Sequence, residues 1–151
     1  MPYTNAVIQE TMRITPLFPA GVPHVTSEDY NLGGYSIAKG TVVVSMTVAI
    51  HNDPDIWADP QVFLPERFLT ADGSRNINHE AFFPFGVGKR ACPGKHLAKH
   101  NLFIFVSSIF QRFSLSVGNS SGKVNLNPKQ ISSTLAPTPQ ELVFTPRSIP
   151  D

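Results

Sequence analysis

Hydrophobic side chains recur at helical spacing in two segments of the chain. In residues 4–14 they predict a first helix, with Thr4 as its N-cap. In residues 95–113 a spacing of three and four predicts a longer helix, whose apolar positions we interpret as core. The apolar positions are Ala6, Val7, Ile8, Met12 and Ile14 in the first segment, and Leu97, Ala98, Leu102, Phe105, Val106, Ile109 and Phe113 in the second.

Shorter apolar runs predict strands. Residues 35–37 and 41–45 flank a turn at 38–40 and predict a hairpin, followed by a short helix over 47–51. Residues 113–117 and 141–145 read as two further strands. The polar residues 69–81 predict a surface loop, and the prolines at 16, 19 and 23 keep the segment after the first helix extended.

Composition narrows the class of protein. The chain has 151 residues, of which 41% are hydrophobic and 15% charged, which suits one globular domain. A net charge of +1 argues against a broad surface for nucleic acid. One cysteine excludes an intrachain disulfide. The pattern shows no signal peptide and no membrane-spanning segment.

That single cysteine, Cys92, lies in the densest glycine cluster, directly before the second predicted helix. Gly86, Gly88 and Gly94 allow a positive φ and close approach of backbone N–H groups to the sulfur. A helix N-terminus and the nearby Arg90 both favour a negative charge, and a thiolate must stay deprotonated to bind a metal. The stretch therefore predicts a thiolate ligand to a metal ion.

Three other interpretations compete for the same residues. A lone cysteine is most often a small buried hydrophobic residue. Cys92, His96 and His100 are spaced by four, as in a zinc site, although no fourth ligand is evident. Residues 86–91 fit G-x-G-x-x-A, but a dinucleotide site needs a preceding strand and a βαβ unit, and prolines bracket this stretch, so we reject it.

Five residues of the stretch resemble the haem-binding loop of the cytochrome P450 monooxygenases, F-x-x-G-x-R-x-C-x-G: Phe85, Gly88, Arg90, Cys92 and Gly94. The resemblance implies that Cys92 is the axial ligand of the iron in haem b (iron protoporphyrin IX) and that Arg90 pairs with a haem propionate. His24 matches a position where relatives place a second propionate partner; otherwise it is an ordinary polar residue. Pro93 follows the cysteine and removes one N–H that could reach the sulfur.

Two further motifs extend the resemblance. Glu10 and Arg13 match E-x-x-R, and residues 65–68 match P-E-R-F, which contributes Arg67. The resemblance implies a buried carboxylate–guanidinium network of these three residues that supports the cysteine loop, whereas an E-x-x-R in isolation is usually a surface ion pair. The run from His51 to Phe68 matches the proline-rich segment of the family and is interpreted as scaffold.

By resemblance, residues 1–151 are a partial P450 domain of the α+β class, mainly α, which holds the C-terminal, haem-proximal portion of the fold. The parent enzyme would insert one atom of O2 into a small apolar substrate. It would take electrons from NADPH-cytochrome P450 reductase at a basic face, and an upstream anchor would hold it on the cytosolic face of the endoplasmic reticulum membrane. The basic face would contain Lys89, Lys95, Lys99 and Arg112, which are otherwise ordinary solvated charges. Substrate contacts would come from Phe18, Ala20, Gly21, Val22 and residues 133–135; the alternative for residues 18–22 is a plain loop packed on the core.

The family's distal helix, with its oxygen-activating residues, has no counterpart in the sequence. We therefore expect the 151-residue chain alone to be inactive and prone to aggregate. The alternative is a non-catalytic product, either a truncated translation or a haem-binding fragment. Residues 119–121 also form a glycosylation triplet, which is a weak motif by itself.

Overall fold

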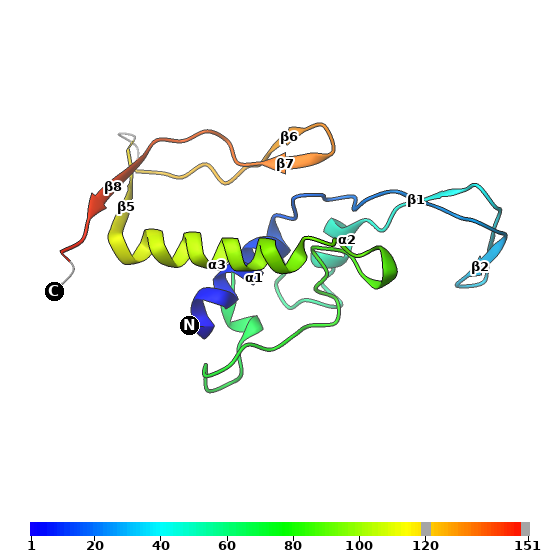
Figure 1. The fold of residues 1–151 in the computed structure, drawn as a ribbon, viewed down its shortest axis with the longest axis horizontal. Helices are drawn as coiled ribbons and strands as arrows, with labels where there is room; N and C mark the ends of the chain where they lie inside the picture. The colour runs from blue at the N-terminus through cyan, green and yellow to red at the C-terminus, as the bar shows by residue number, and fades with distance from the viewer. Residues whose placement is uncertain (119–121, 149–151) are drawn as a thin grey trace.

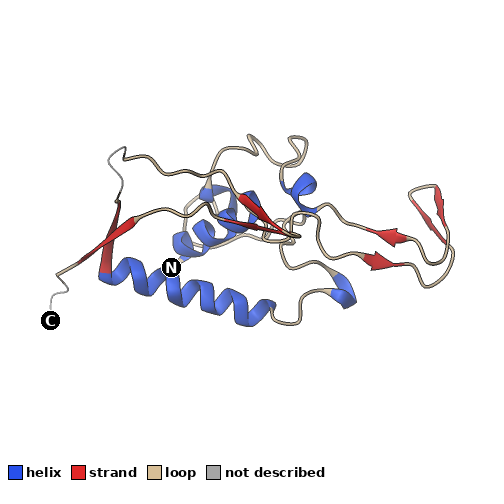
Figure 2. Cartoon of the chain, turned by 90° about the horizontal axis from the view of Figure 1, so that it is seen from above, coloured by secondary structure: helices blue, strands red, loops and turns tan. Residues whose placement is uncertain are grey.

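The computed structural model describes residues 1–118 and 122–148, so the glycosylation triplet lies outside the described residues. The chain forms an elongated body in which α1 (Pro2–Ile14) contacts α3 (Lys95–Arg112), with small sheets toward both ends (Figure 1; Figure 2). No helix within the described ranges is both long enough and apolar enough to span a membrane.

Helix α1 begins two residues earlier than the pattern predicts. Met1 is its N-cap and Pro2 its first residue, a position where proline is favoured because that N–H has no helical partner. The Thr4 cap is therefore wrong, and Thr4 lies inside the first turn. The face that α1 buries includes both apolar and charged residues, namely Ala6, Ile8, Glu10 and Arg13.

The core is small and lies beneath α1. Ala6, Trp57 and Phe68 form it, and the 3-10 helix η1 (Pro65–Phe68) packs on α1. Leu69, Ala81 and Phe82 pack around this cluster and are partly buried. The short helix α2 (Thr47–His51) follows the predicted bounds and also contacts α1. The core therefore gathers chain segments that are far apart in sequence.

The predicted hairpin of residues 35–37 with 41–45 is wrong in its pairing. Strand β3 (Tyr35–Ile37) pairs instead with β2 (Tyr30–Leu32), and β4 (Val42–Val43) pairs with β1 (His24–Val25). The reason is the turn at Gly33 and Gly34, which both have positive φ, as a tight two-residue hairpin requires. Residues 24–43 therefore form one long projection, in which the β2–β3 pair lies within the connection between β1 and β4.

The loop of residues 69–81 runs over the surface as predicted, apart from a bridge between Leu69 and Asn76. Asp72 organises its turn by accepting hydrogen bonds from Thr70 and from the N–H and hydroxyl of Ser74. These bonds lower the pKa of the Asp72 carboxyl to about 2. The turn is local and exposed, so we assign it a structural role only.

The C-terminal part begins with η2 (Gly88–Arg90) and α3. The prediction that α3 presents core positions is wrong for this chain, because none of its residues is buried. Strand β5 (Phe113–Val117) pairs with β8 (Leu142–Pro146), as the two predicted apolar runs allow. Between them, β6 (Lys129–Ile131) and β7 (Thr134–Ala136) form a further hairpin.

Candidate functional site

Glu10 and Arg13 form a buried ion pair on α1. Arg13 Nε donates to Glu10 Oε2 at 2.7 Å, and Arg13 Nη2 donates to Glu10 Oε1 at 2.9 Å. Both side chains have zero solvent exposure. Two parallel N–H···O bonds match the planar fork of the guanidinium, so the pair has one fixed geometry. The alternative of an exposed surface pair does not describe these residues.

Arg67 of η1 adds a second guanidinium to the same carboxylate. Its Nε donates to Glu10 Oε1 at 3.2 Å, and the N–H of Leu64 donates to that oxygen at 3.0 Å. Glu10 therefore accepts bonds from α1 and from the segment of residues 64–67. One buried carboxylate joins two parts of the chain that are more than fifty residues apart.

Further N–H groups of both arginines donate to backbone carbonyls. Arg13 donates to His51 O at 2.6 Å and to Pro60 O at 2.7 Å. Arg67 donates to the carbonyls of Ala58, Asp59 and Val62. Asp59 has a φ of 46°, a left-handed value that turns the chain back within residues 58–62. The network thus fixes the backbone of an irregular segment.

The network also controls the charge of Glu10. Burial would raise the pKa of the Glu10 carboxyl, but the hydrogen bonds from Arg13 and Leu64 and the charges of Arg13 and Arg67 outweigh burial and lower it. Glu10 is therefore ionised at neutral pH. Among the described residues, no hydrogen bond or ion pair joins the three to Cys92, so we interpret their role as structural.

Aromatic rings surround Trp57, which also contacts Arg13 of the network. The Arg13 guanidinium lies 5.3 Å from the centre of the Trp57 ring, and the His79 ring stacks on Trp57 at 3.9 Å. Trp57 Nε1 donates to Ile50 O at 3.1 Å, which satisfies the only polar atom of its side chain. The sequence motif places Trp57 in the scaffold but gives no indication of its stacking on His79.

His51, at the end of α2, is the residue that sequence reasoning underestimated. Its side chain has zero exposure, and its Nε2 accepts the N–H of Phe83 at 3.2 Å. Burial, with a contribution from the Arg13 charge, lowers the pKa of its imidazole to about 4, so the ring is neutral at pH 7. The one sequence feature that could have indicated its role is that this polar residue directly follows the apolar residues 48–50.

The cysteine loop, residues 85–94, starts two residues after Phe83. The N–H of Cys92 donates to Phe85 O at 2.8 Å, which closes the loop, and Gly86 and Gly88 have φ values of 73° and 69°. Gly94 is the N-cap of α3, and a Cβ there would lie 3.9 Å from Cys92 Sγ. The sulfur therefore lies beside the N-terminus of α3.

Cys92 is a free and exposed thiol, so the interpretation as a buried hydrophobic residue is wrong. Cys92 precedes the first residue of α3 by three positions and does not share a helical face with His96 and His100. The part of the chain that the structure describes holds no group of three or more His, Cys, Asp or Glu side chains placed to share a metal ion. Residues 82–87 contain no strand, so the dinucleotide motif lacks its context.

The other predicted site residues come from separate parts of the chain. Arg90 ends η2 and is exposed, and Phe85 is half-buried at the start of the loop. His24 is exposed on β1. Among the described residues, neither Arg90 nor His24 makes a hydrogen bond or ion pair that joins it to Cys92.

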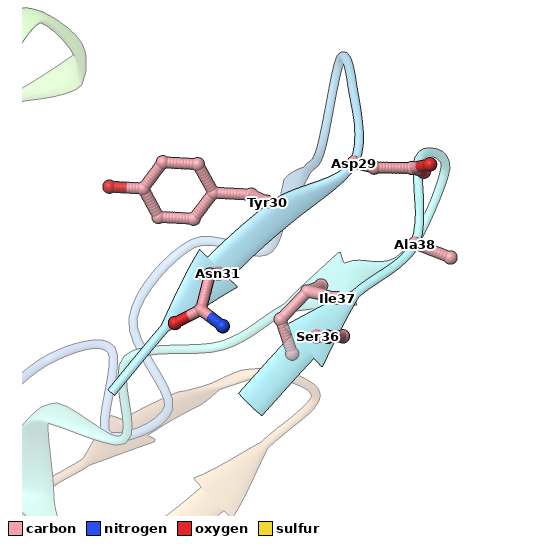
Figure 3. A pocket seen from close by; sticks show the side chains of 6 residues that line it. All are labelled: Asp29, Tyr30, Asn31, Ser36, Ile37 and Ala38. Carbon is pink, nitrogen blue, oxygen red and sulfur yellow. The ribbon is translucent and has the colours of Figure 1, made fainter. Parts of the chain in front are cut away.

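Two segments predicted to contact substrate do meet. The N–H of Leu135, on β7, donates to the carbonyl of Leu17 at 3.0 Å, which brings residues 133–135 to the segment around Phe18. A separate shallow hollow lies over β2 and β3 (Figure 3) and is lined by Asp29, Tyr30, Asn31, Ser36, Ile37 and Ala38. It contains none of the predicted site residues, and we assign it no function.

Comparisons with known proteins agree with these motifs. A family model described as Cytochrome P450 matches residues 1–144. The chain is 42% identical over 147 residues to Cytochrome P450 2U1 of Homo sapiens, which covers 97% of this chain and 27% of that protein. It is 43% identical over 148 residues to Cytochrome P450 2J1 of Oryctolagus cuniculus, covering 98% of this chain and 29% of the relative. The chain thus spans less than a third of the length of these curated relatives.

Proposed function

The chain belongs to the cytochrome P450 family, and we propose that Cys92 is the thiolate ligand of a haem iron in a microsomal-type monooxygenase. The observation that carries the proposal is the placement of the F-x-x-G-x-R-x-C-x-G residues. They form a closed loop whose only thiol is exposed at the start of α3. An exposed sulfur can bind a metal that approaches from outside the loop.

The residues around Cys92 fit a planar anionic cofactor such as haem b. Gly88 and Gly94 carry no side chain to obstruct its approach, and the half-buried Phe85 would supply an apolar wall for the cofactor. Arg90 and His24 are exposed and would bind the propionates. Pro93 offers no N–H to the sulfur, which leaves the thiolate less stabilised than a residue with an N–H would.

When bound, the haem would supply the activation of O2 for insertion of one oxygen atom into a small apolar substrate. The chain's own contribution is to present the Cys92 sulfur at the start of α3 and to hold the loop against the core. The joined segments around Phe18 and residues 133–135 would form part of the wall of the substrate pocket.

The partners and location follow from the same family. We propose that NADPH-cytochrome P450 reductase docks on the face that carries Lys89, Lys95, Lys99 and Arg112, of which all but Lys95 are exposed. Such docking weakens as salt rises, because the attraction is electrostatic. The parent enzyme would lie on the cytosolic face of the endoplasmic reticulum membrane.

We propose that residues 1–151 are the haem-proximal part of the P450 domain and do not turn over substrate by themselves. No residue of α3 is buried, and large apolar side chains such as Leu97, Ile104 and Phe105 are more than half exposed. A substrate pocket needs walls that exclude water, and these side chains are mostly exposed to solvent. Turnover by the purified chain with reductase and NADPH would refute this part of the proposal.

The ligand assignment is tested by the absorption spectrum of the haem-loaded chain, reduced and treated with carbon monoxide. The unchanged chain and a His100→Ala control should both show the Soret shift typical of a thiolate ligand. Cys92→Ala should lose it. A shift that persists in Cys92→Ala, or that disappears in His100→Ala, would assign the ligand elsewhere.

A further inference from the structure

His51 connects the ion network to the cysteine loop, and no motif assigns it that role. We propose that His51 is a positioning residue, whose Nε2 atom fixes the N–H of Phe83 and thereby the start of the segment that presents Cys92. The inference rests on the proposed function of Cys92. It adds a residue that touches neither the sulfur nor the expected cofactor.

A short series of hydrogen bonds leads from His51 to the sulfur-bearing residue. His51 Nε2 accepts from Phe83 N at 3.2 Å, and Phe83 O accepts from Gly86 N at 2.9 Å. Phe85 O then accepts from Cys92 N at 2.8 Å. The turn that opens the loop, from Phe83 O to Gly86 N, and the bond that closes it, from Phe85 O to Cys92 N, both involve residues 83–86. A shift of Phe83 would therefore move both ends of the loop.

On its other side, His51 is held firmly. Its backbone carbonyl accepts the Arg13 Nη1 bond at 2.6 Å, so the ion network fixes its main chain. Its ring lies 5.8 Å from Phe82 in a stacked arrangement and 5.3 Å from Phe83 edge-on. The ring also meets Trp57 edge-on at 6.5 Å. A ring enclosed on these sides has one available orientation, which is what a positioning residue requires.

The hydrogen-bonding state of the imidazole separates a positioning role from simple packing. Because Nε2 accepts, the proton of the neutral ring is on Nδ1, which is buried and has no partner among the described residues. An unpaired buried N–H destabilises the fold. Phenylalanine would stack equally well without that cost, so what histidine adds is the acceptor at Nε2.

Protonation would abolish the acceptor, and the surroundings oppose it. The charged group that faces His51 is the Arg13 guanidinium from α1, and the rings that pack on it come from residues 57, 82 and 83. No described carboxylate contacts the imidazole to stabilise a positive charge. The acceptor is therefore available at neutral pH.

The test uses two variants of the chain without haem and measures amide hydrogen exchange. His51→Phe keeps an aromatic ring but removes the acceptor, and His51→Gln places an amide oxygen near the position of Nε2. In His51→Phe we expect exchange of the Phe83 and Cys92 amides to be about tenfold faster. In His51→Gln both rates should return to within about threefold of the unchanged chain.

The controls are His100→Phe, at an exposed position on α3, and the amide of Thr26, which is bonded to Thr41 O in the distant hairpin. His100→Phe should leave exchange of the Phe83 and Cys92 amides unchanged, and exchange of the Thr26 amide should be the same in the His51 variants as in the unchanged chain. Unchanged exchange at Phe83 in His51→Phe overturns the inference, as does a His51→Gln variant that exchanges as fast as His51→Phe. If His51→Phe does not fold, normal exchange at Phe83 in His51→Gln still supports the acceptor role, whereas failure of both variants to fold overturns it.

The outcome is independent of the ligand assignment. Loss of the Cys92 assignment in the carbon monoxide experiment leaves the exchange rates of the haem-free chain as they are. Conversely, a normal thiolate spectrum together with unchanged exchange in His51→Phe overturns only the role of His51.

Discussion

Arg13 donates a 2.6 Å hydrogen bond to the carbonyl oxygen of His51, across a separation of 38 residues. This bond joins the ion network of α1 to His51 at the end of α2. The His51 side chain in turn accepts the N–H of Phe83. The buried charges and the cysteine loop are therefore parts of one connected structure. Its stability should depend on each of the groups along this path.

Neutralising Glu10 should be strongly destabilising. Glu10→Gln removes the negative charge shared by Arg13 and Arg67, and it leaves two guanidinium groups with little compensation. We expect a loss of about 3–5 kcal/mol in the free energy of unfolding, measured by urea denaturation followed by Trp57 fluorescence. The matched control is Glu66→Gln, at an exposed position in η1, which should change stability by less than about 0.5 kcal/mol. Equal effects of the two variants would contradict the network.

Stability should fall as the pH is lowered. The folded-state pKa of His51 is about 4, below its ordinary value of 6.5, so its contribution is complete above pH 6.5 and is lost as the pH falls toward 4. The pKa of Glu10 is also lowered, from 4.5, so its contribution is lost at still lower pH. His51→Phe should flatten the pH dependence between 6.5 and 4 and leave the more acidic part in place. A slope that is identical in both chains would contradict the neutral state of His51.

Gly21 should not tolerate a side chain. Its φ is +67°, and a Cβ at this position would meet the hydroxyl oxygen of Ser45. Gly73 has a similar φ of +70° but nothing within 4 Å, so Gly73→Ala measures backbone strain alone, about 1–2 kcal/mol. Gly21→Ala should cost at least about 1 kcal/mol more in urea denaturation. Adding Ser45→Ala to Gly21→Ala should recover most of that difference, and no recovery would show that the contact is not responsible.

Replacing Trp57 should weaken the core even when an aromatic ring remains. Trp57→Phe removes the indole N–H that donates to Ile50 O, and it reduces the ring face that contacts Arg13 and His79. We expect a loss of about 2–3 kcal/mol, measured by circular dichroism because Trp57 is the only tryptophan. The exposed Phe105→Leu on α3 is the control and should be nearly neutral. A neutral Trp57→Phe would contradict the role of these contacts.

The sequence predicted the helices better than the sheets, for a physical reason. Helical spacing is a local property, so α1, α2 and α3 lie close to their predicted ranges. Strand pairing depends on which turn closes a ladder, and the Gly33–Gly34 turn redirected β3 to β2. The burial of α3 could not be read from its apolar spacing, since the pattern shows which face is apolar but not whether another segment covers it.

Some residues of the candidate site could likewise be predicted from the sequence, and others could not. The motifs brought Glu10, Arg13 and Arg67 to attention, and the structure places them together. His51 was visible only as scaffold, because its importance comes from Phe83, 32 residues further along the chain. No local pattern reports such a partner. The Trp57–His79 stack was missed for the same reason, since it joins a structured segment to a surface loop.

The arginine network has a consequence for how this segment can change over evolutionary time. The guanidinium groups bind carbonyl oxygens of residues 51, 58, 59, 60 and 62, atoms that every amino acid carries. Mutations that alter the exposed side chains of Ala58 and Val62 therefore leave the anchoring intact. The exposed positions of this segment can therefore change while its path in space stays constant, so related chains should share this path even where these exposed residues differ.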